Sequence, residues 1–204
     1  MLLPIFLAGC SDDPVHKPHG YFRIDLPADS IRPATAPCPF TAHIPVYARL
    51  LPAAGTGAAA SAAGAQGLQA CWTDLVFPGQ HAVVHMTWRR IQGDLPELVH
   101  DAYAFKEKHQ AMATRIRTED VVRDSARVYG TLFNVEGNVA SPFVFYLTDS
   151  TTNFLYGALY FDVHPNADSL APVSGRIRSD MERFARSLRW ERPAGAVQHV
   201  QHGH

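Results

Sequence analysis

The sequence predicts an α+β protein in which an antiparallel sheet is flanked by helices. The first observation is the stretch GNVASPFVFYLTDSTTNFLYGALYF, residues 137–161, which has the pattern of two long strands joined by a turn. Its first strand is largely apolar on both faces, because Phe143, Phe145 and Leu147 alternate with Val144, Tyr146 and Thr148. The second observation is a helical stripe of apolar residues near the C-terminal end. Helices on both faces would cover such strands, which predicts an α/β/α sandwich.

The first ten residues, MLLPIFLAGC, end in small residues directly before Cys10. This ending resembles the lipobox of bacterial lipoproteins, in which the cysteine is acylated and becomes the mature N-terminus. Residues 1–10 contain no Lys or Arg and are shorter than a complete secretory signal, so we interpret them as a truncated lipoprotein signal peptide. An ordinary hydrophobic run is the alternative. Residues 11–19 then form a polar tether, and no later apolar run is long enough to span a bilayer.

The rest of the chain has the composition of one globular domain, which we place at residues 20–191. The formal net charge of the chain is -1. It therefore lacks the basic field that nucleic-acid binding requires, and nucleic acid is excluded as a partner class.

The cysteines left after Cys10 is assigned to lipid are Cys38 and Cys71. In an oxidising envelope compartment such a pair most simply forms a disulfide, worth roughly 3 to 4 kcal/mol on the chain-entropy model. A zinc site formed by the two cysteines and histidines is the alternative. No C-x-x-C motif is present and no H-x-x-x-H pair accompanies the cysteines, so we predict the disulfide and no metal site.

Several extended segments are predicted in the first part of the chain. Residues 20–27, GYFRIDLP, alternate as a half-buried strand that is stopped by proline. A proline-rich irregular passage follows, and residues 40–50 are again extended. Residues 52–70 consist almost wholly of Ala, Gly and Ser, which predicts a flexible surface loop between the two cysteines.

A hairpin follows this loop, with strands at 72–77 and 82–91 and a turn at 78–80. His81 and His85 share one face of the second strand. Four positions along a strand correspond to about 13 Å, which is too far for one metal ion, so both are interpreted as ordinary strand residues.

The first predicted helix begins at Asp94, an N-cap acid followed by a proline in the first turn. Its apolar face continues, less cleanly, through Met112, Ala113 and Ile116. Residues 127–136 form a further strand, which leads into the long hairpin.

The closing helix is the most regular element of the sequence. One side is an apolar stripe, and the other side bears charges of both signs, which we interpret as solvated surface. The stripe consists of Ile177, Met181, Phe184, Ala185 and Leu188, and the charged set of Arg176, Arg178, Asp180, Glu182, Arg183 and Arg186. Residues 192–204 have no core-forming pattern and predict a disordered tail; metal chelation by its three histidines is the alternative.

The order of elements, with a helix directly after the last long hairpin, resembles the PsbP-like α/β/α sandwich, an analogy of fold alone. A more specific resemblance is to the gliding motility lipoprotein GldD family of the Bacteroidetes. It is based on the segments CPFTAHIPVYARL, CW, KHQAMATRI, the 137–161 stretch, PNADSLAPV and LRW. The similarity covers nearly all of residues 20–190, although the 52–70 loop is longer than the family needs.

The resemblance implies a lipid-anchored envelope protein that is required for gliding, is linked to the type IX secretion machinery and has no known catalytic activity. We expect no cofactor. The implied partners are other gliding and secretion proteins of the envelope and, through the lipid on Cys10, a membrane. The expected location is the periplasmic face, with inner and outer membrane both open. Residues 11–13, Ser-Asp-Asp, resemble the acidic sorting signals of some surface lipoproteins.

A hydrolase is a remote alternative. Ser141, Ser150, His109, His164 and Asp149 are residue types found in catalytic triads, but neither serine lies in a G-x-S-x-G motif. The sequence also lacks the Walker, H-E-x-x-H and G-x-G-x-x-G motifs. We therefore predict a protein that is not an enzyme.

Two classes of binding function remain. Contact with a partner protein would use exposed turns at one end of the sheet, for which the candidates are Asp149, Ser150, Thr151, Asn153, Asn166 and Asp168. Alternatively, these residues only shape turns and cap the last helix. A small-ligand or lipid-binding module would instead have an apolar cavity lined by residues such as Phe143, Tyr146, Tyr156 and Phe184.

Overall fold

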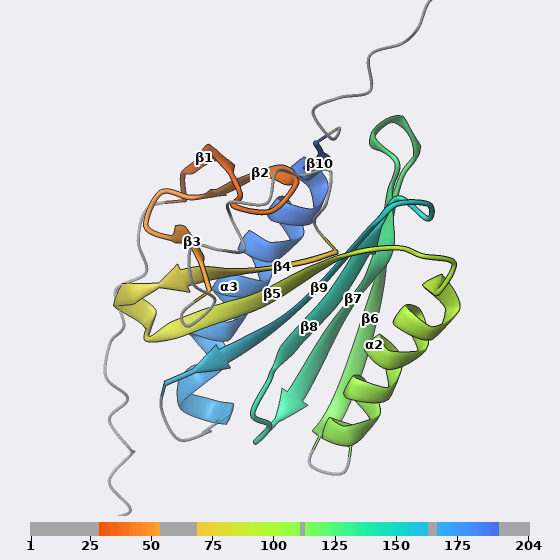
Figure 1. The fold of residues 1–204 in the computed structure, drawn as a ribbon. Helices are drawn as coiled ribbons and strands as arrows, with labels where there is room; N and C mark the ends of the chain where they lie inside the picture. The colour runs from red at the N-terminus through yellow and green to blue at the C-terminus, as the bar shows by residue number, and fades with distance from the viewer. Residues whose placement is uncertain (1–28, 54–68, 111–112, 163–166, 192–204) are drawn as a thin grey trace, which may run out of the picture.

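The computed structural model describes residues 29–53, 69–110, 113–162 and 167–191. Its central element is a seven-stranded sheet in the order β3-β4-β5-β9-β8-β7-β6, in which all neighbours are antiparallel (Figure 1). The strands are β3 Arg49–Pro52, β4 Ala70–Phe77, β5 Ala82–Arg90, β6 Ala113–Arg123, β7 Val128–Gly137, β8 Phe143–Thr148 and β9 Asn153–Phe161. The predicted α+β class with an antiparallel sheet and flanking helices is confirmed.

Several predictions fall on residues outside these ranges. They concern Cys10, the tether at 11–19, the strand at 20–27, most of the 52–70 loop and the tail at 192–204. The side chains of residues 105–110 and 167–169, within the two helices, are not described either.

The two helices lie on opposite faces of the sheet (Figure 1). Helix α3, Ala167–Ser187, buries the predicted stripe from Ile177 to Ala185, and Leu188 is buried directly after the helix ends; each of these residues is at most 1% exposed. Helix α2, Leu95–Gln110, packs its Leu98 and Ala102 against Phe154 on the other face. Because β8 and β9 are covered from both sides, their two-sided apolar pattern has a direct physical cause.

A second, three-stranded sheet packs on α3. It consists of β1 Ile31–Thr35, β2 Phe40–Pro45 and β10 Arg189–Trp190 in the order β1-β2-β10. The ring of Phe184 lies between Phe40 of β2 and Phe145 of β8, with centroid distances of 6.0 and 6.2 Å. The proline-rich passage is thus not wholly irregular. Pro33 lies in β1, an edge strand, where the missing N–H of proline is tolerated.

The structure contains the disulfide between Cys38 and Cys71, with Cα atoms 5.6 Å apart. Both cysteines are buried. The bond joins the segment that precedes β2 to strand β4, so it fastens the small sheet to the main one across a sequence separation of 33 residues.

The largest correction concerns the segment after Gln110, where the apolar face of the first helix was expected to continue through Met112, Ala113 and Ile116. Helix α2 ends at Gln110, and Ala113–Arg123 form β6, which pairs with β7 alone. Only Val121 of this strand is fully buried. An edge strand that buries so few side chains has no alternation of apolar and polar residues in its sequence. The spacing of Met112, Ala113 and Ile116 is also compatible with one face of a helix, so the segment was predicted as helical.

Two glycines allow close approaches inside the sheet. A Cβ atom on Gly130 of β7 would lie 2.0 Å from the carbonyl oxygen of Tyr146, and one on Gly157 of β9 would lie 2.3 Å from the ring of Phe145. Any side chain at either position would displace its neighbour, so both strands require glycine there.

Candidate functional site

The turn between β8 and β9 contains four of the predicted partner-binding residues and is organised around Asp149. The Oδ1 atom of Asp149 accepts hydrogen bonds of 2.7 to 2.9 Å from the backbone N–H groups of Thr151, Thr152 and Asn153. Its Oδ2 atom accepts one of 2.7 Å from the side-chain amide of Asn153, whose oxygen in turn accepts from Trp88. Asp149 and Asn153 are buried, so their side chains are engaged in shaping the turn.

Only Ser150 and Thr151 of this turn have exposed side chains. Arg127 donates a hydrogen bond of 3.1 Å to the Thr151 hydroxyl. Asn166 lies outside the described residues, and Asp168 belongs to the first turn of α3, beyond the far end of β9. Within the part of the chain that the structure describes, Ser150 and Thr151 thus lie exposed at the β8–β9 turn, and the backbone of Asp168 lies at the other end of β9.

The carboxyl group of Asp149 is held in its ionised form. Burial alone would raise its pKa, but the hydrogen bonds from the backbone of residues 151–153 and from the Asn153 side chain outweigh burial, so the pKa of Asp149 is lowered. The turn is consequently most stable when this carboxyl is charged.

The residue types considered for a catalytic triad are not assembled among the described residues. Ser141 is fully buried and donates to the carbonyl oxygen of Phe143, while Ser150 is exposed at the turn. His109 and His164 have no described side chain.

The two histidines of the β4–β5 hairpin differ from the prediction in one respect. His81 does not share a strand face with His85, because it ends the short turn Pro78–Gln80 with a left-handed φ of 47°. His85 is exposed on β5, with its Nδ1 atom 2.8 Å from Oδ1 of Asp74 on β4. No group of three or more His, Cys, Asp or Glu side chains suited to a metal ion occurs within the described ranges.

The cavity expected for a lipid or small ligand is not formed by the predicted residues. Phe143 and Phe184 belong to the core on the α3 face. Tyr146 and Tyr156 belong to clusters on the α2 face, where Tyr146 stacks on Phe154 at 5.6 Å. Because the sheet separates the two pairs, they cannot line one cavity.

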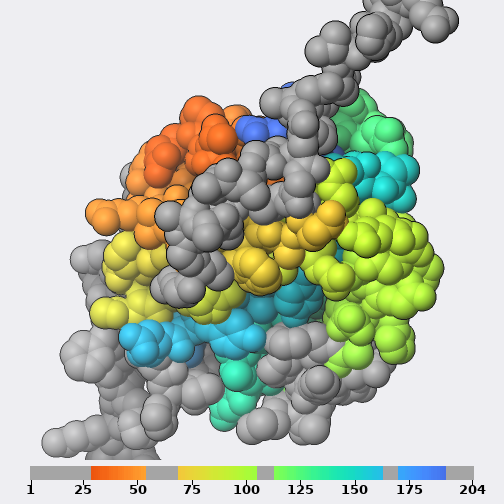
Figure 2. Space-filling view, in the orientation of Figure 1, coloured from red at the N-terminus to blue at the C-terminus, as the bar shows by residue number. Residues whose placement is uncertain are grey.

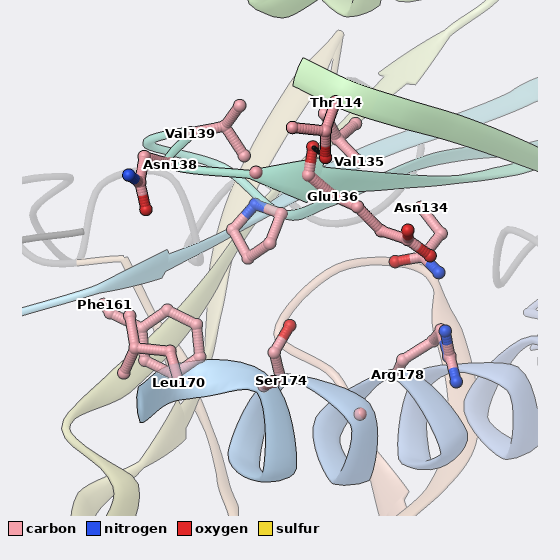
Figure 3. Close-up of a pocket in the computed structure, with 14 residues that line it drawn as sticks. Thr114, Asn134, Val135, Glu136, Asn138, Val139, Phe161, Leu170, Ser174 and Arg178 are labelled. Carbon is pink, nitrogen blue, oxygen red and sulfur yellow. Dashed lines mark hydrogen bonds between the residues drawn. The ribbon is translucent and has the colours of Figure 1, made fainter. Parts of the chain in front are cut away.

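A groove of about 520 Å³ lies elsewhere, between the β7–β8 connection and the first half of α3 (Figure 3). Its sheet wall includes Thr114, Asn134, Glu136, Val139 and Pro142, and its helix wall includes Leu170, Ala171, Ser174, Gly175 and Arg178. Ser174 and Arg178 point from α3 toward the sheet wall, from which Glu136 and Asn134 point back (Figure 3). We call this site the groove.

Both signs of charge are present in the groove. Glu136 is paired with Arg117 at 2.7 Å, and Arg178 lies 3.8 Å from Glu182. The side chains of Glu136 and Arg178 are each 37% exposed, so both remain accessible to a further partner. Partly exposed apolar side chains of Pro142, Phe161 and Leu170 lie beside these charges.

Sequence reasoning did not find the groove, because its walls come from segments far apart in the chain. The sequence did contain one feature that indicates the groove. Ala171, Ser174 and Gly175 are small residues on one side of α3, and a Cβ atom on Gly175 would meet nothing within 4 Å. Small side chains on a helix that otherwise buries large ones leave open space above the sheet.

Asp180 requires a second correction, because it was assigned to a solvated helix surface and is 1% exposed. Its carboxylate accepts hydrogen bonds from the Tyr47 hydroxyl and from Arg183, and Arg176 lies 3.6 Å from it. Asp29 pairs with both arginines from the outside. Burial, reinforced by the bond to Asp180, raises the pKa of Tyr47. This network fastens the β2–β3 connection to α3.

Comparison with known proteins agrees with the sequence resemblance. A family model described as gliding motility lipoprotein GldD matches residues 11–190. No curated protein and no solved structure matches the chain. Among the described residues, no helix has the length and apolar character needed to cross a membrane. The family consists of motility lipoproteins, not of known enzymes, and implies a membrane-anchored place in the cell envelope. The chain belongs to the GldD family of gliding motility lipoproteins.

Proposed function

We propose that the protein supports gliding motility as a lipid-anchored adaptor. In this proposal it is acylated at Cys10, faces the periplasm and acts by contact with other envelope proteins, those of the type IX secretion machinery among them. The groove is the observation that supports contact, because charged, polar and apolar side chains converge there on open space.

The lining of the groove suits a polypeptide segment. Glu136 offers a carboxylate, Arg178 a guanidinium and Asn134 an amide, next to the apolar surface of Pro142 and Leu170. A polypeptide supplies backbone donors and acceptors, together with side chains of either charge. A lipid tail would cover these polar groups without pairing them, which costs free energy.

A small polar ligand is the second candidate. The volume of the groove lies within the range of roughly 300–1,000 Å³ that is usual for ligand sites. Such a ligand would need to match both charges, as a zwitterion does.

The direct test fills the groove with a large side chain. Ser174→Trp places an indole against the sheet wall, whereas Ser179→Trp places the same side chain at an exposed position of α3 that does not line the groove. We expect Ser174→Trp to stop gliding and reduce type IX secretion at an unchanged level of membrane-bound protein, and Ser179→Trp to behave like the unaltered chain. Normal gliding with Ser174→Trp would contradict a role for the groove.

Crosslinking in native envelopes distinguishes the two candidates. A photo-reactive residue at Ala171, on the helix wall, should capture gliding or secretion proteins, and Ser174→Trp should abolish the adducts. Capture of a small metabolite without any protein would favour the ligand-binding role instead.

A further inference from the structure

The two edges of the main sheet differ in kind. Strand β3 is four residues long and ends at Pro52, which are features of a protected edge. Strand β6 has eleven residues, contains no proline or glycine and pairs on one side only. Among the described residues, no backbone hydrogen bond joins its other edge. β6 therefore presents a row of N–H and C=O groups that another strand could pair with.

The side chains of β6 are also largely uncovered, although α2 and α3 approach the strand from its two faces. Thr114, Arg115, Arg117, Thr118, Glu119, Asp120 and Val122 are exposed. Val122 is 67% exposed, more than the other exposed large hydrophobic residues of the described ranges. A strand added at this edge would cover part of this surface.

We propose that two copies of the chain pair through β6 as antiparallel strands, about a two-fold axis at Thr118. Main-chain pairing of this kind would join the two seven-stranded sheets into one continuous sheet. The occupant of the edge is then a second copy, and the argument for it is the order of charges along the strand.

Charge order and strand length together favour a second copy in one register. In a symmetric antiparallel pair centred on Thr118, each Arg117 faces Glu119 of the other copy, and no like charges face each other. If the two-fold axis passes through Arg117, Glu119 or Asp120, that charged residue faces the same residue of the second copy. Centring on Ile116 places Arg115 opposite Arg117. Among registers centred on residues 115–120, only the one at Thr118 avoids repulsion. Centring on Val121 also avoids it but pairs only the last part of β6, whereas Thr118 is the middle residue of the strand and its register pairs the whole of β6.

The neighbouring ion pairs would extend the same alternation. Arg117 already contacts Glu136 at 2.7 Å and is 53% exposed, and Glu119 contacts Arg186 at 3.5 Å and is 52% exposed. Pairing at Thr118 would place four charged side chains in a row. Glu136 and Arg117 of one copy would be followed by Glu119 and Arg186 of the second copy, so that the charges alternate in sign. Charges at an edge ordinarily prevent pairing of sheets; here the basic residues precede Thr118 and the acidic ones follow it, so they favour one antiparallel arrangement.

Single cysteines in the full-length, membrane-anchored protein test the register. Directly opposite residues of antiparallel strands have Cα atoms about 4.5–5.5 Å apart, which is within disulfide range. Thr118→Cys should therefore form covalent dimers under mild oxidation. Val122→Cys should not, because Val122 faces Thr114 and lies about 26 Å from its own counterpart. Both residues are exposed, so neither substitution removes a core contact.

A charge exchange then tests the mechanism. Added to Thr118→Cys, Arg117→Glu should lower the dimer yield on the order of tenfold, because two attractive pairs become repulsive. The further change Glu119→Arg should restore it. Absence of dimers with Thr118→Cys, equal yields with Val122→Cys, failed restoration, or adducts only with a different protein would each overturn the inference. Ser174→Trp should leave the Thr118→Cys dimer unchanged, so failure of the groove and failure of the edge are distinguishable.

Discussion

The α3 face and the α2 face of the main sheet are packed differently. On the α3 face, one cluster of buried residues runs without interruption through both sheets and α3. On the α2 face, the buried residues form two small clusters, one at Leu98 and Phe154 and one at Phe133 and Val144. Helix α2 makes its main contacts with β6 to β9, while Trp72 on β4 remains 43% exposed. In Figure 2, surface of β4, in gold, is visible beside α2, in yellow-green.

This difference shows which layer holds the fold together. The α3 face joins segments that are distant in the chain, and the Cys38–Cys71 disulfide and the buried Asp180 fasten them. Helix α2 directly follows β5 and precedes β6, so its attachment is more local in sequence. Because hydrophobic stabilisation grows with the apolar area buried, most of the stability should come from the α3 face.

Truncation of one large side chain on each face should give the largest contrast. Phe184→Ala removes a ring that touches Phe40 and Phe145 in the continuous core, and we expect it to lower the free energy of unfolding by about 3–5 kcal/mol. Leu98→Ala opens the small α2 cluster to solvent and should cost about 2 kcal/mol. Denaturant titration of both variants measures the two values, and an equal or larger loss for Leu98→Ala would refute the comparison.

Removal of the disulfide should have the next largest effect. The paired changes Cys38→Ser and Cys71→Ser should lower stability by about 2–4 kcal/mol, since the unfolded chain gains the freedom of a loop with a sequence separation of 33 residues. Reducing agent added to the unaltered protein provides the control. It should reproduce the loss there and have no effect on the double variant; a reductant effect of equal size on both would mean that this bond is not the cause.

A smaller effect is expected at the β8–β9 turn, which belongs to neither helical layer. The folded state lowers the pKa of Asp149, so the stabilisation from its ionised form is fully present above the unfolded pKa of about 3.9 and is lost as the pH falls through the lower folded value. The loss should be smaller than the losses expected for Phe184→Ala and for removal of the disulfide. Urea titrations between about pH 6 and 2 measure it, with Asp149→Asn as the control that should remove this part of the pH dependence. If the pH dependence of stability were the same in Asp149→Asn as in the unaltered protein, the acid sensitivity would have to come from other carboxyl groups.

Much of the fold could be predicted because its signals are local. The alternation in residues 143–148, the stripe on α3 and the side chains of the β8–β9 turn each involve neighbours in the chain, and the structure confirms all three. The candidate site was less accessible to prediction. The turn residues proposed for partner contact include the buried Asp149 and Asn153, and the groove has walls contributed by segments far apart in sequence.

By itself, the sequence determined the long hairpins, the helix after the last of them, the pairing of Cys38 with Cys71 and the family, because these depend on residue spacing and on the kinds of residues present. Only the tertiary structure decided the roles of β6 and Asp180. The charged residues of 113–123 are compatible with a helix until β7 supplies a neighbour to pair with. Asp180 looks solvated until Tyr47, from another part of the chain, covers it. In both cases burial and pairing depend on contacts that exist only once distant segments have packed.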